Sequence, residues 1–386
     1  MNNEQKLLID LLRMEFCDCS DIKLPQLDDD ILEKLLSFAA YHSVAPIISE
    51  TLFNRHLLDD SKLKEYYKQI LLKSVFRYEM QNGQQIKVCR LFEENEICHI
   101  ALKGAVLRDF YPEPWLRTSC DIDILIYPED LERAIEVLKN NGYLYKGKGS
   151  HDASFYSDDN VHVELHYDVI EKEYRVADVS DVLCDIWQYA SPKPNFKYEY
   201  VLTDEMFYFY HIAHMAKHFV QGGCGIRAFL DLWIIDRNMH FDSEKRSELL
   251  VKGGLRVFAD NAHKLADVWF LGGEHTDITE KMQSYIFNGG IYGNLENQIA
   301  MDQAKTDSKT ESALKKIFLG YDTIKFHYPI LQKHKWLLPF MEVRRWGKLM
   351  FIRKHRERSV NHLLVNKSIS KDQKTEAEEL RTYLGL

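Results

Sequence analysis

The sequence predicts an α+β fold in which a small mixed β-sheet core lies between an N-terminal and a C-terminal helical segment. Apolar residues recur at helical spacing before residue 97 and again after residue 173, whereas short apolar or alternating runs, which are typical of strands, are concentrated between them. A chain of 386 residues is also long enough for two or three domains. We therefore expect a helical segment at 1–97, an α/β core at 98–172 and a helical domain at 173–386.

Several stretches of the N-terminal segment have the pattern of amphipathic helices. The clearest follows the acids at 28–30, because negative side chains are favourable at a helix N-terminus and apolar residues recur from Ile31 onward. A longer helix is expected over about 61–96. The first 97 residues are therefore expected to be mainly helical.

The periodicity changes at the start of the predicted core. Residues 100–102 form a short apolar run that favours a strand, and a helix-like stretch follows at 105–110. A second strand is expected at 120–126, and Pro128 then opens an amphipathic helix through Leu138. This order of elements predicts a small sheet with helices packed against it.

More strands are expected after Gly142. Residues 161–168 alternate strictly between apolar and polar side chains, and successive side chains of a strand point to opposite faces. The last part of the core is therefore predicted to have a polar strand face. That face carries His162, Glu164, His166 and Asp168.

The helical period returns in the C-terminal segment, where a glycine-rich turn at 222–225 separates two of the predicted helices. The polar stretch 367–374 is expected to be a loop that precedes a terminal helix. The other helices are expected at 205–220, at 229–235, within 244–270 and at 310–325.

The formal net charge is −9, so the chain as a whole is not prepared electrostatically for a polyanion. The segment 333–358 departs from this average, with nine Lys or Arg against two Glu. Four aromatic residues between these charges permit two interpretations. Stacking and phosphate contacts would hold single-stranded nucleic acid, whereas an amphipathic helix would pack its aromatics onto the α/β core, and we favour packing. The aromatic residues are Trp336, Phe340, Trp346 and Phe351.

No apolar run approaches the length of about 18–20 residues that spans a bilayer, and the N-terminal residues lack the pattern of a secretory signal. The seven cysteines are scattered and odd in number, unlike those of a secreted disulfide scaffold. We therefore expect a cytoplasmic protein with reduced thiols and no membrane partner.

The sharpest chemical signal is Asp121-x-Asp123, in which apolar residues are interleaved with two carboxylates. On a strand these carboxylates project side by side, and such a pair can hold Mg²⁺ or Mn²⁺ together with substrate phosphates. A third carboxylate from a neighbouring strand would complete a two-ion site, and Glu164 is the candidate. The alternative is that both aspartates lie on a solvated strand face.

A glycine lies between the first strand and the helix-like stretch, at Lys103-Gly104-Ala105. Glycine lets the backbone approach a phosphate closely, and the amides at a helix start point toward the anion. Lys103 adds a positive charge. This turn is therefore a candidate phosphate-binding element.

The order of strand, glycine turn, helix and Asp-x-Asp strand resembles the polymerase-beta-like nucleotidyltransferases, whose pattern is hG[GS], then [DE]h[DE]h, then a later h[DE]h. Two features depart from this pattern. Ala105 stands where those enzymes commonly have Gly or Ser, and sixteen residues separate Gly104 from Asp121.

Both departures are shared with a narrower bacterial group that the sequence resembles, the uncharacterised nucleotidyltransferase family. The resemblance spans most of the chain and is densest between residues 100 and 235. It rests on Leu102-Lys103-Gly104, Tyr111-Pro112, Arg117-x-x-x-Asp121-Ile122-Asp123, the Val-Glu-Leu-His strand at 163–166, the segment with His211, His214, Lys217 and His218, the turn Gly225-Ile226-Arg227 with Asp231, and loosely a Leu-Leu-Pro at 337–339.

The resemblance implies an enzyme, a Mg²⁺- or Mn²⁺-dependent nucleotidyltransferase that moves a nucleoside monophosphate from an NTP to an acceptor and releases pyrophosphate. Asp121 and Asp123 would hold the metal, and Glu164 would hold a second ion or take the acceptor proton. The acceptor is expected to be a small molecule, a sugar or a peptide-like compound. A toxin-like enzyme acting on an RNA end, or a non-catalytic nucleotide-binding relative, is the alternative. The nucleotide-binding candidates are Lys103, Gly104, Ala105, Arg117 and His166.

Two of these candidates also have structural interpretations. Arg117 either binds a phosphate or pairs with a nearby acid. His166 either contacts a phosphate, orients a carboxylate or is a hydrogen-bonded strand residue. The sequence leaves these alternatives open.

A predicted helix carries His211, His214 and His218 on one face, because these residues are three and four positions apart. The face could bind zinc, form a pocket wall or pack in the core. On the following turn, Arg227 and Asp231 are four residues apart, which permits an intrahelical ion pair or a role in the pocket. The candidate pocket residues are His214, Lys217, His218 and Arg227.

Overall fold

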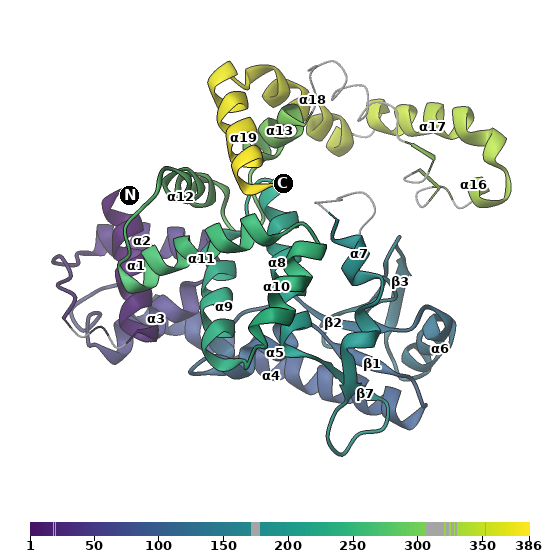
Figure 1. Cartoon of the computed structure of the whole chain (residues 1–386), viewed down its shortest axis with the longest axis horizontal. Coiled ribbons are helices and arrows are strands. Elements are labelled where there is room, and N and C mark those ends of the chain that lie inside the picture. The colour runs from purple at the N-terminus through teal and green to yellow at the C-terminus, as the bar shows by residue number, and fades with distance from the viewer. Residues whose placement is uncertain are drawn as a thin grey trace.

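The computed structural model describes residues 1–17, 19, 21–170, 178–305, 320–321, 324–325, 328, 330–351 and 353–386. In this part of the chain it confirms the predicted α+β class, because a mixed sheet of seven strands is packed between helical segments (Figure 1). The helix expected at 310–325 lies for the most part outside the described residues.

The sheet consists, from one edge to the other, of β3 (Leu144–Lys148), β4 (Asp152–Tyr156), β5 (His162–His166), β2 (Asp121–Ile126), β1 (His99–Ala101), β7 (Glu199–Leu202) and β6 (Ala190–Pro192). The central strand β2 pairs in parallel with β5 and antiparallel with β1. β1 in turn pairs in parallel with β7. The strands expected near 100–102, at 120–126, after Gly142 and at 161–168 are all present.

Two strands lie outside the range expected for the core. β6 and β7 follow residue 172, where helices were expected, and they extend the sheet beyond β1. Strands of three and four residues, one of them containing Pro192, are too short to give a period-two signal. A residue distant in sequence holds β7: the Glu93 carboxylate accepts hydrogen bonds of 2.7, 2.9 and 3.1 Å from the amides of Lys197, Tyr198 and Glu199.

The N-terminal helices are α1 (Asn3–Phe16), α2 (Asp29–Tyr41) and α3 (Ala45–Asn54). α2 begins at the predicted acids, where the Asp28 carboxylate accepts a hydrogen bond from the amide of Ile31 at 2.8 Å. Such a cap satisfies an amide that has no partner within the helix. The apolar residues of all three helices join a large core with helices from the C-terminal part of the chain.

One face of the sheet is covered by α4 (Lys64–Glu94) and α6 (Leu131–Asn140). Phe92 of α4 packs with Ile122 and Ile124 of β2 in a shared apolar cluster. The interleaved isoleucines of β2 therefore enter the core. Because the side chains of a strand alternate, the acids between them point to the opposite face.

Helices form most of the chain after β7. The stretch 244–270 is two helices, α10 (Ser243–Lys252) and α11 (Arg256–Leu271), because the chain turns at Gly254 with a φ of +67°. The remaining helices are α5 (Gly104–Leu107), α7 (Ser180–Leu183), α8 (Asp204–Val220), α9 (Gly225–Asn238), α12 (Asp277–Gly289), α13 (Leu295–Ala304), α16 (Ile330–Lys333), α17 (Leu338–Phe351), α18 (Arg353–Ser368) and α19 (Lys371–Leu384).

The expectation of a loop at 367–374 is wrong. α18 runs to Ser368 and α19 begins at Lys371, so only two residues separate the helices. The Ser370 hydroxyl accepts a hydrogen bond from the Gln373 amide, and the Gln373 side chain accepts one from the Ser370 amide. Polar residues that suggested a loop therefore form a capping box at a helix start.

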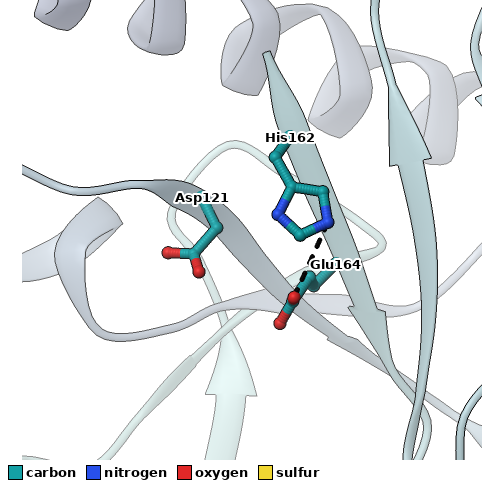
Figure 2. A group of neighbouring side chains, drawn as sticks. All are labelled: Asp121, His162 and Glu164. Carbon is teal, nitrogen blue, oxygen red and sulfur yellow. Dashed lines mark ion pairs between the residues drawn. The ribbon is translucent and has the colours of Figure 1, made fainter. Parts of the chain in front are cut away.

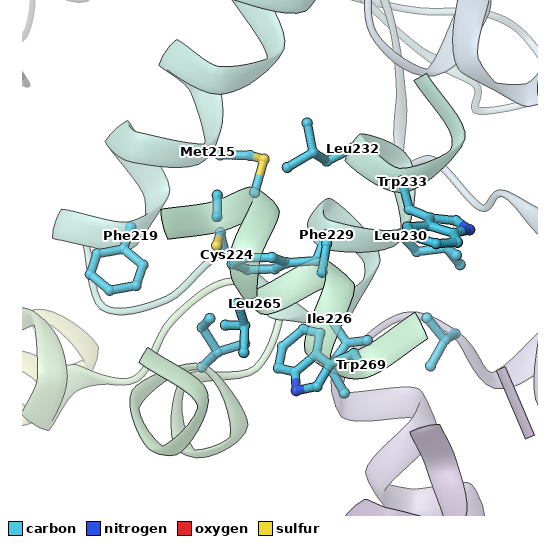
Figure 3. Close-up of a cluster of buried hydrophobic side chains, with 14 of the residues drawn as sticks. Met215, Phe219, Cys224, Ile226, Phe229, Leu230, Leu232, Trp233, Leu265 and Trp269 are labelled. Atoms are coloured by element: carbon cyan, nitrogen blue, oxygen red, sulfur yellow. The ribbon is translucent and has the colours of Figure 1, made fainter. Parts of the chain in front are cut away.

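The centre of the helical part is an aromatic cluster between α8, α9 and α11 (Figure 3). Phe229 of α9 meets the ring of Trp269 of α11 edge to face, with 5.0 Å between their centroids. Met215 and Phe219 of α8 are buried in the same core. This packing fixes α8 and α9 as a rigid wall beside the sheet.

Two aromatics of the basic segment do not pack as we favoured, and the side chain of Phe351 lies outside the described part of the structure. Trp336 and Phe340 are 69% and 62% exposed, and their rings contact each other edge to face. The surrounding apolar residues form a small separate cluster around Tyr328 and Leu331. Figure 1 accordingly draws α17 apart from the sheet, beyond α18. The interpretation of packing onto the α/β core is therefore wrong for these two residues.

None of the helices in the described part of the chain combines the length and the apolarity that crossing a bilayer requires.

His42 follows α2 and is fully buried where the N-terminal helices meet the C-terminal ones. Its ring lies 4.6 Å from that of Phe38 and 6.1 Å from that of Phe287, and its Nδ1 accepts a hydrogen bond from the Ile226 amide at 3.3 Å. Burial lowers the pKa of this imidazole to about 4. The neutral form is therefore the one that the fold stabilises.

We expect His42→Asn to remove part of the acid sensitivity of the fold. The unfolded histidine takes up a proton below pH 6.5 and the folded one only near pH 4, so wild-type stability falls as the pH drops through this window. Through this residue, the free energy of unfolding of the wild type should fall by about 2 kcal/mol at pH 5. Urea unfolding of both proteins at pH 7.5 and pH 5 measures this loss of stability. Asparagine is the chosen substitute because it keeps a hydrogen-bond acceptor but cannot titrate. Equal changes in the two proteins would contradict the assignment.

Candidate active site

The acids of β2 and β5 meet on the face of the sheet opposite α4. The parallel register places Asp121 beside His162 and Asp123 beside Glu164. Paired residues of parallel strands point to the same face, so the three predicted carboxylates are brought together. The alternative of a simple solvated face fails for Asp123, which is only 3% exposed.

Two groups of side chains in this face have the geometry of a metal site. In the outer group, ligand atoms of Asp121, His162 and Glu164 all lie within 4.8 Å of one another (Figure 2). In the inner group the same holds for Asp123, Glu164 and His166. Glu164 belongs to both groups, which makes it the residue that connects them.

His162 joins this site although the sequence analysis gave it no functional role. Its Nε2 lies 3.6 Å from Glu164 Oε1 and is hydrogen-bonded to Ser154 Oγ at 2.7 Å. Its ring also stacks on Tyr156, with 4.7 Å between centroids. The sequence did contain a signal for a role of His162 in the site. The strict alternation of residues 161–168 places His162 on the same strand face as Glu164.

Asp123 is the most tightly held of the acids. Its Oδ1 accepts hydrogen bonds from Lys103 Nζ at 3.0 Å and from the ring of His166 at 2.7 Å. Burial alone would raise the pKa of this carboxyl, but the Lys103 charge and the His166 hydrogen bond outweigh burial and hold the pKa well below its usual range. Asp123 is therefore an anion at every physiological pH. His166 thus orients a carboxylate, which was one of its three predicted roles.

Glu164 titrates in a different range. Burial, followed by repulsion from Asp123, raises the pKa of this carboxyl to about 7, and the nearby His166 offsets only part of the shift. His166 Nε2 lies 3.7 Å from Glu164 Oε2. The site therefore holds one permanently ionised carboxylate and one that exchanges a proton near neutral pH, a combination typical of catalytic acids and bases.

Lys103 reaches Asp123 from an unusual backbone conformation. Its φ is +45°, which non-glycine residues rarely adopt, and Gly104 begins α5 directly after it. Burial lowers the pKa of the ammonium, but the charge of Asp123 more than compensates and leaves this pKa above its ordinary value. Backbone strain of this kind persists only where surrounding contacts enforce it, and here the partly buried ion pair with Asp123 supplies the contact.

Gly104 is needed at its position because other side chains approach it closely. A Cβ at this residue would lie 2.7 Å from Arg117 Nη1 and 3.2 Å from Ser119 Oγ. The glycine therefore makes room for the segment that leads into β2. Ala105, also predicted to bind nucleotide, does not line the cavity of the site.

Arg117 pairs with an acid, which was one of the two roles that the sequence left open for it. Its Nε and Nη2 each donate a hydrogen bond of 2.9 Å to the Asp231 carboxylate, and the Tyr111 hydroxyl donates a third of 2.7 Å. All three side chains are buried. This pair ties the segment before β2 to α9.

The intrahelical ion pair between Arg227 and Asp231 is absent from the described contacts. Arg227 Nη1 instead donates to the Thr118 carbonyl at 2.7 Å and to the Thr118 hydroxyl at 3.3 Å. No ion pair joins this guanidinium to a carboxylate in the part of the chain that the structure describes. Burial, followed by the positive charge of Arg117, lowers the pKa of Arg227. The site therefore contains a cation that a substrate anion can still neutralise.

The three histidines of α8 form part of the cavity wall. His211 Nε2 is hydrogen-bonded to the Ala228 carbonyl at 3.1 Å, while the Nε2 atoms of His214 and His218 lie 3.3 Å apart. Burial, and then the charges of His218 and Lys103, lower the pKa of His214 far below its usual value. None of these histidines belongs to either metal-capable group among the described residues, so zinc finds no support here.

These side chains enclose a cavity of about 270 Å³ between the sheet and α8 and α9. Tyr292, which lies outside the motifs found in the sequence, stands at its rim with its hydroxyl 3.1 Å from Cys120 Sγ. The predicted site residues in the lining are Lys103, Gly104, Arg117, Asp121, Asp123, Glu164, His166, His211, His214, Lys217, His218 and Arg227.

A family model described as an uncharacterised nucleotidyltransferase matches residues 29–271. The chain belongs to this family. The matched region runs from α2 to α11 and includes the sheet and both metal-capable groups. A search of curated proteins found no match. Membership of the family supports nucleotidyl transfer as the general activity and an NTP as a substrate.

We expect Asp231→Asn to destabilise the protein by about 3–5 kcal/mol, because it leaves the buried Arg117 guanidinium without a counter-charge. Asp260→Asn is the matched control, since it removes an exposed i,i+4 pair with Arg256 and should cost at most about 1 kcal/mol. Denaturant unfolding at pH 7.5 measures both. Equal losses in the two variants would show that Arg117 and Asp231 do not form a buried pair.

Proposed function

We propose that the protein transfers a nucleoside monophosphate from an NTP to an acceptor hydroxyl, with release of pyrophosphate, in a reaction that needs Mg²⁺ or Mn²⁺. The observation that carries this proposal is the convergence of Asp121, Asp123 and Glu164 beside a cavity with a basic wall. A small molecule, a sugar or a peptide-like compound is the favoured acceptor.

The acids fit a divalent cation. Carboxylate oxygens are the ligands that Mg²⁺ and Mn²⁺ prefer, and the two overlapping groups around Glu164 offer a place for each of two ions. We assign Asp121 and Asp123 as metal ligands, with Glu164 available to both groups. When bound, the ions would neutralise phosphate charge and polarise the phosphorus–oxygen bonds.

The wall of the cavity formed by α8 and α9 suits a triphosphate. Lys217 and Arg227 line it, Lys103 lines the cavity beside Asp123, and the half-buried Arg227 has no carboxylate partner among the described residues. Guanidinium and ammonium groups bind phosphate oxygens through charge-assisted hydrogen bonds. His214 and His218 add ring nitrogens that can donate or accept there. We assign this wall to the phosphates of the NTP.

The chemical step follows from these positions. The acceptor oxygen forms a bond to the α-phosphorus, the bond from that phosphorus to the β-phosphate oxygen breaks, and pyrophosphate leaves. Glu164 either holds a second ion or takes the acceptor proton. Lys103 and Arg227 stabilise negative charge on the phosphates, and His166 holds Asp123 in position. Positioning and charge neutralisation supply most of the rate in such reactions.

An RNA end is the second candidate acceptor. The exposed Trp336 and Phe340 beside the Lys and Arg residues of α17 favour an RNA acceptor. Aromatic side chains within a basic surface bind single-stranded nucleic acid by stacking. A non-catalytic role in nucleotide binding is less well supported, since binding alone does not require three converging carboxylates.

We expect the wild-type protein to transfer label from one of four α-labelled NTPs to a discrete species in a cell extract with Mg²⁺. Asp123→Asn should lower the transfer at least 100-fold because it removes a charge at the reaction centre. Glu132→Gln, an exposed acid of α6, is the matched control and should transfer normally. Ribonuclease treatment of the product distinguishes an RNA acceptor. Normal transfer by Asp123→Asn would refute the proposed chemistry.

We also expect the site to bind Mn²⁺ in the absence of nucleotide. Glu164→Gln should weaken binding at least tenfold, because Glu164 is shared by both ligand groups. Electron paramagnetic resonance of free Mn²⁺ measures the occupancy without any turnover, and Glu132→Gln again serves as control. Unchanged binding by Glu164→Gln would remove Glu164 from the metal site.

A further inference from the structure

A second hollow, of about 870 Å³, lies on the other side of the segment that leads into β2. We call it the α4 groove. One wall comes from α4, and the other comes from residues 118 and 120 and the turn at 159–161. Its lining from α4 consists of Ile70, Leu72, Lys73, Ser74, Phe76, Arg77, Met80 and Gln81.

The α4 groove borders the active-site cavity. Cys120 lines both hollows and directly precedes Asp121. The wall between them is held from both sides, because Gln81 of α4 donates to the Ser119 carbonyl at 3.0 Å and Arg227 of α9 donates to the Thr118 carbonyl at 2.7 Å. The two hollows therefore lie on either side of the segment 118–120, next to the outer carboxylate of the site.

The α4 wall of the groove combines exposed apolar surface with positive charge, and Asp159 on the other wall accepts a hydrogen bond from Gln84 at 3.2 Å. Phe76 and Leu72 are 68% and 52% exposed, although both are large apolar side chains on a helix. Lys73 and Arg77 lie beside them, are also exposed, and form no ion pair with any residue that the structure describes. Exposed apolar surface of this kind marks binding sites, and adjacent unpaired cations select a ligand that carries an anionic group.

We propose that the α4 groove binds the acceptor, and that the acceptor has an apolar body and an acidic group. This inference rests on the proposed function and names the acceptor class for the same site. In-line transfer requires the attacking oxygen and the leaving pyrophosphate on opposite sides of the α-phosphorus. An NTP in the cavity and an acceptor whose reacting end extends from the α4 groove past Cys120 would meet that requirement beside Asp121. Phe76 contacts the apolar body, and Arg77 pairs with the acidic group.

The first test measures binding without turnover. The probe is 1-anilinonaphthalene-8-sulfonate, which has an apolar ring system and one anionic group. Phe76→Ala and Arg77→Glu should each weaken its binding at least fivefold. Tyr66→Ala and Arg90→Glu change an exposed aromatic and an exposed arginine of the same helix outside the groove, and should bind as wild type does. Equal affinity in groove and control variants, or no binding by wild type, would overturn the proposal.

The second test uses label transfer from NTP in a cell extract. Phe76→Ala and Arg77→Glu should lower transfer at least tenfold while the affinity for Mn²⁺ and NTP stays unchanged, because the cavity is intact. Normal transfer by both variants would reject the groove as the acceptor site and leave the proposed function standing. No transfer by wild type would refute the function itself, and the probe experiment would then decide alone whether the groove binds such ligands.

Discussion

The parallel pairing of β2 with β5 is the constraint on which the candidate site depends. It sets Asp123 beside Glu164, and because the side chains of a strand alternate, a slip of one residue would turn these acids into the apolar layer below the sheet. Ile122 and Ile124 oppose the slip, since their exchange with aspartate would bury an unpaired carboxylate against α4. Hydrophobic packing beneath the sheet thus fixes the acids above it.

Paired charges then connect this sheet face to the helices that close the cavity. Arg117 and Asp231 join the segment before β2 to α9, and Lys103 joins the turn after β1 to Asp123. Each pair satisfies groups that burial would otherwise penalise heavily. Among the described residues, Arg227 donates hydrogen bonds to the carbonyl and hydroxyl of Thr118 and pairs with no carboxylate, so positive charge remains available in the cavity wall.

Local periodicity was sufficient to predict the strands of the acids, the shared face of Glu164 and His166, and the glycine turn after β1, because these depend on neighbouring residues. Other contacts between distant residues were not predictable, although the meeting of Glu164 with the two aspartates was. The partner of Arg117 is 114 residues away, and β7 depends on Glu93, which lies on a different element. His162 was placed on the correct face but given no role, because its nearness to Asp121 follows only from the register of two strands.

The length of α4 links features that otherwise look separate. At about 46 Å, this helix of 31 residues supplies one side of the α4 groove, supports β2 from below through Phe92, and holds the start of β7 through Glu93. Gln81, near its middle, also holds the Ser119 carbonyl. One helix therefore sets the distance between the groove and the acids. A ligand bound along α4 would contact a wall that cannot move independently of the carboxylates.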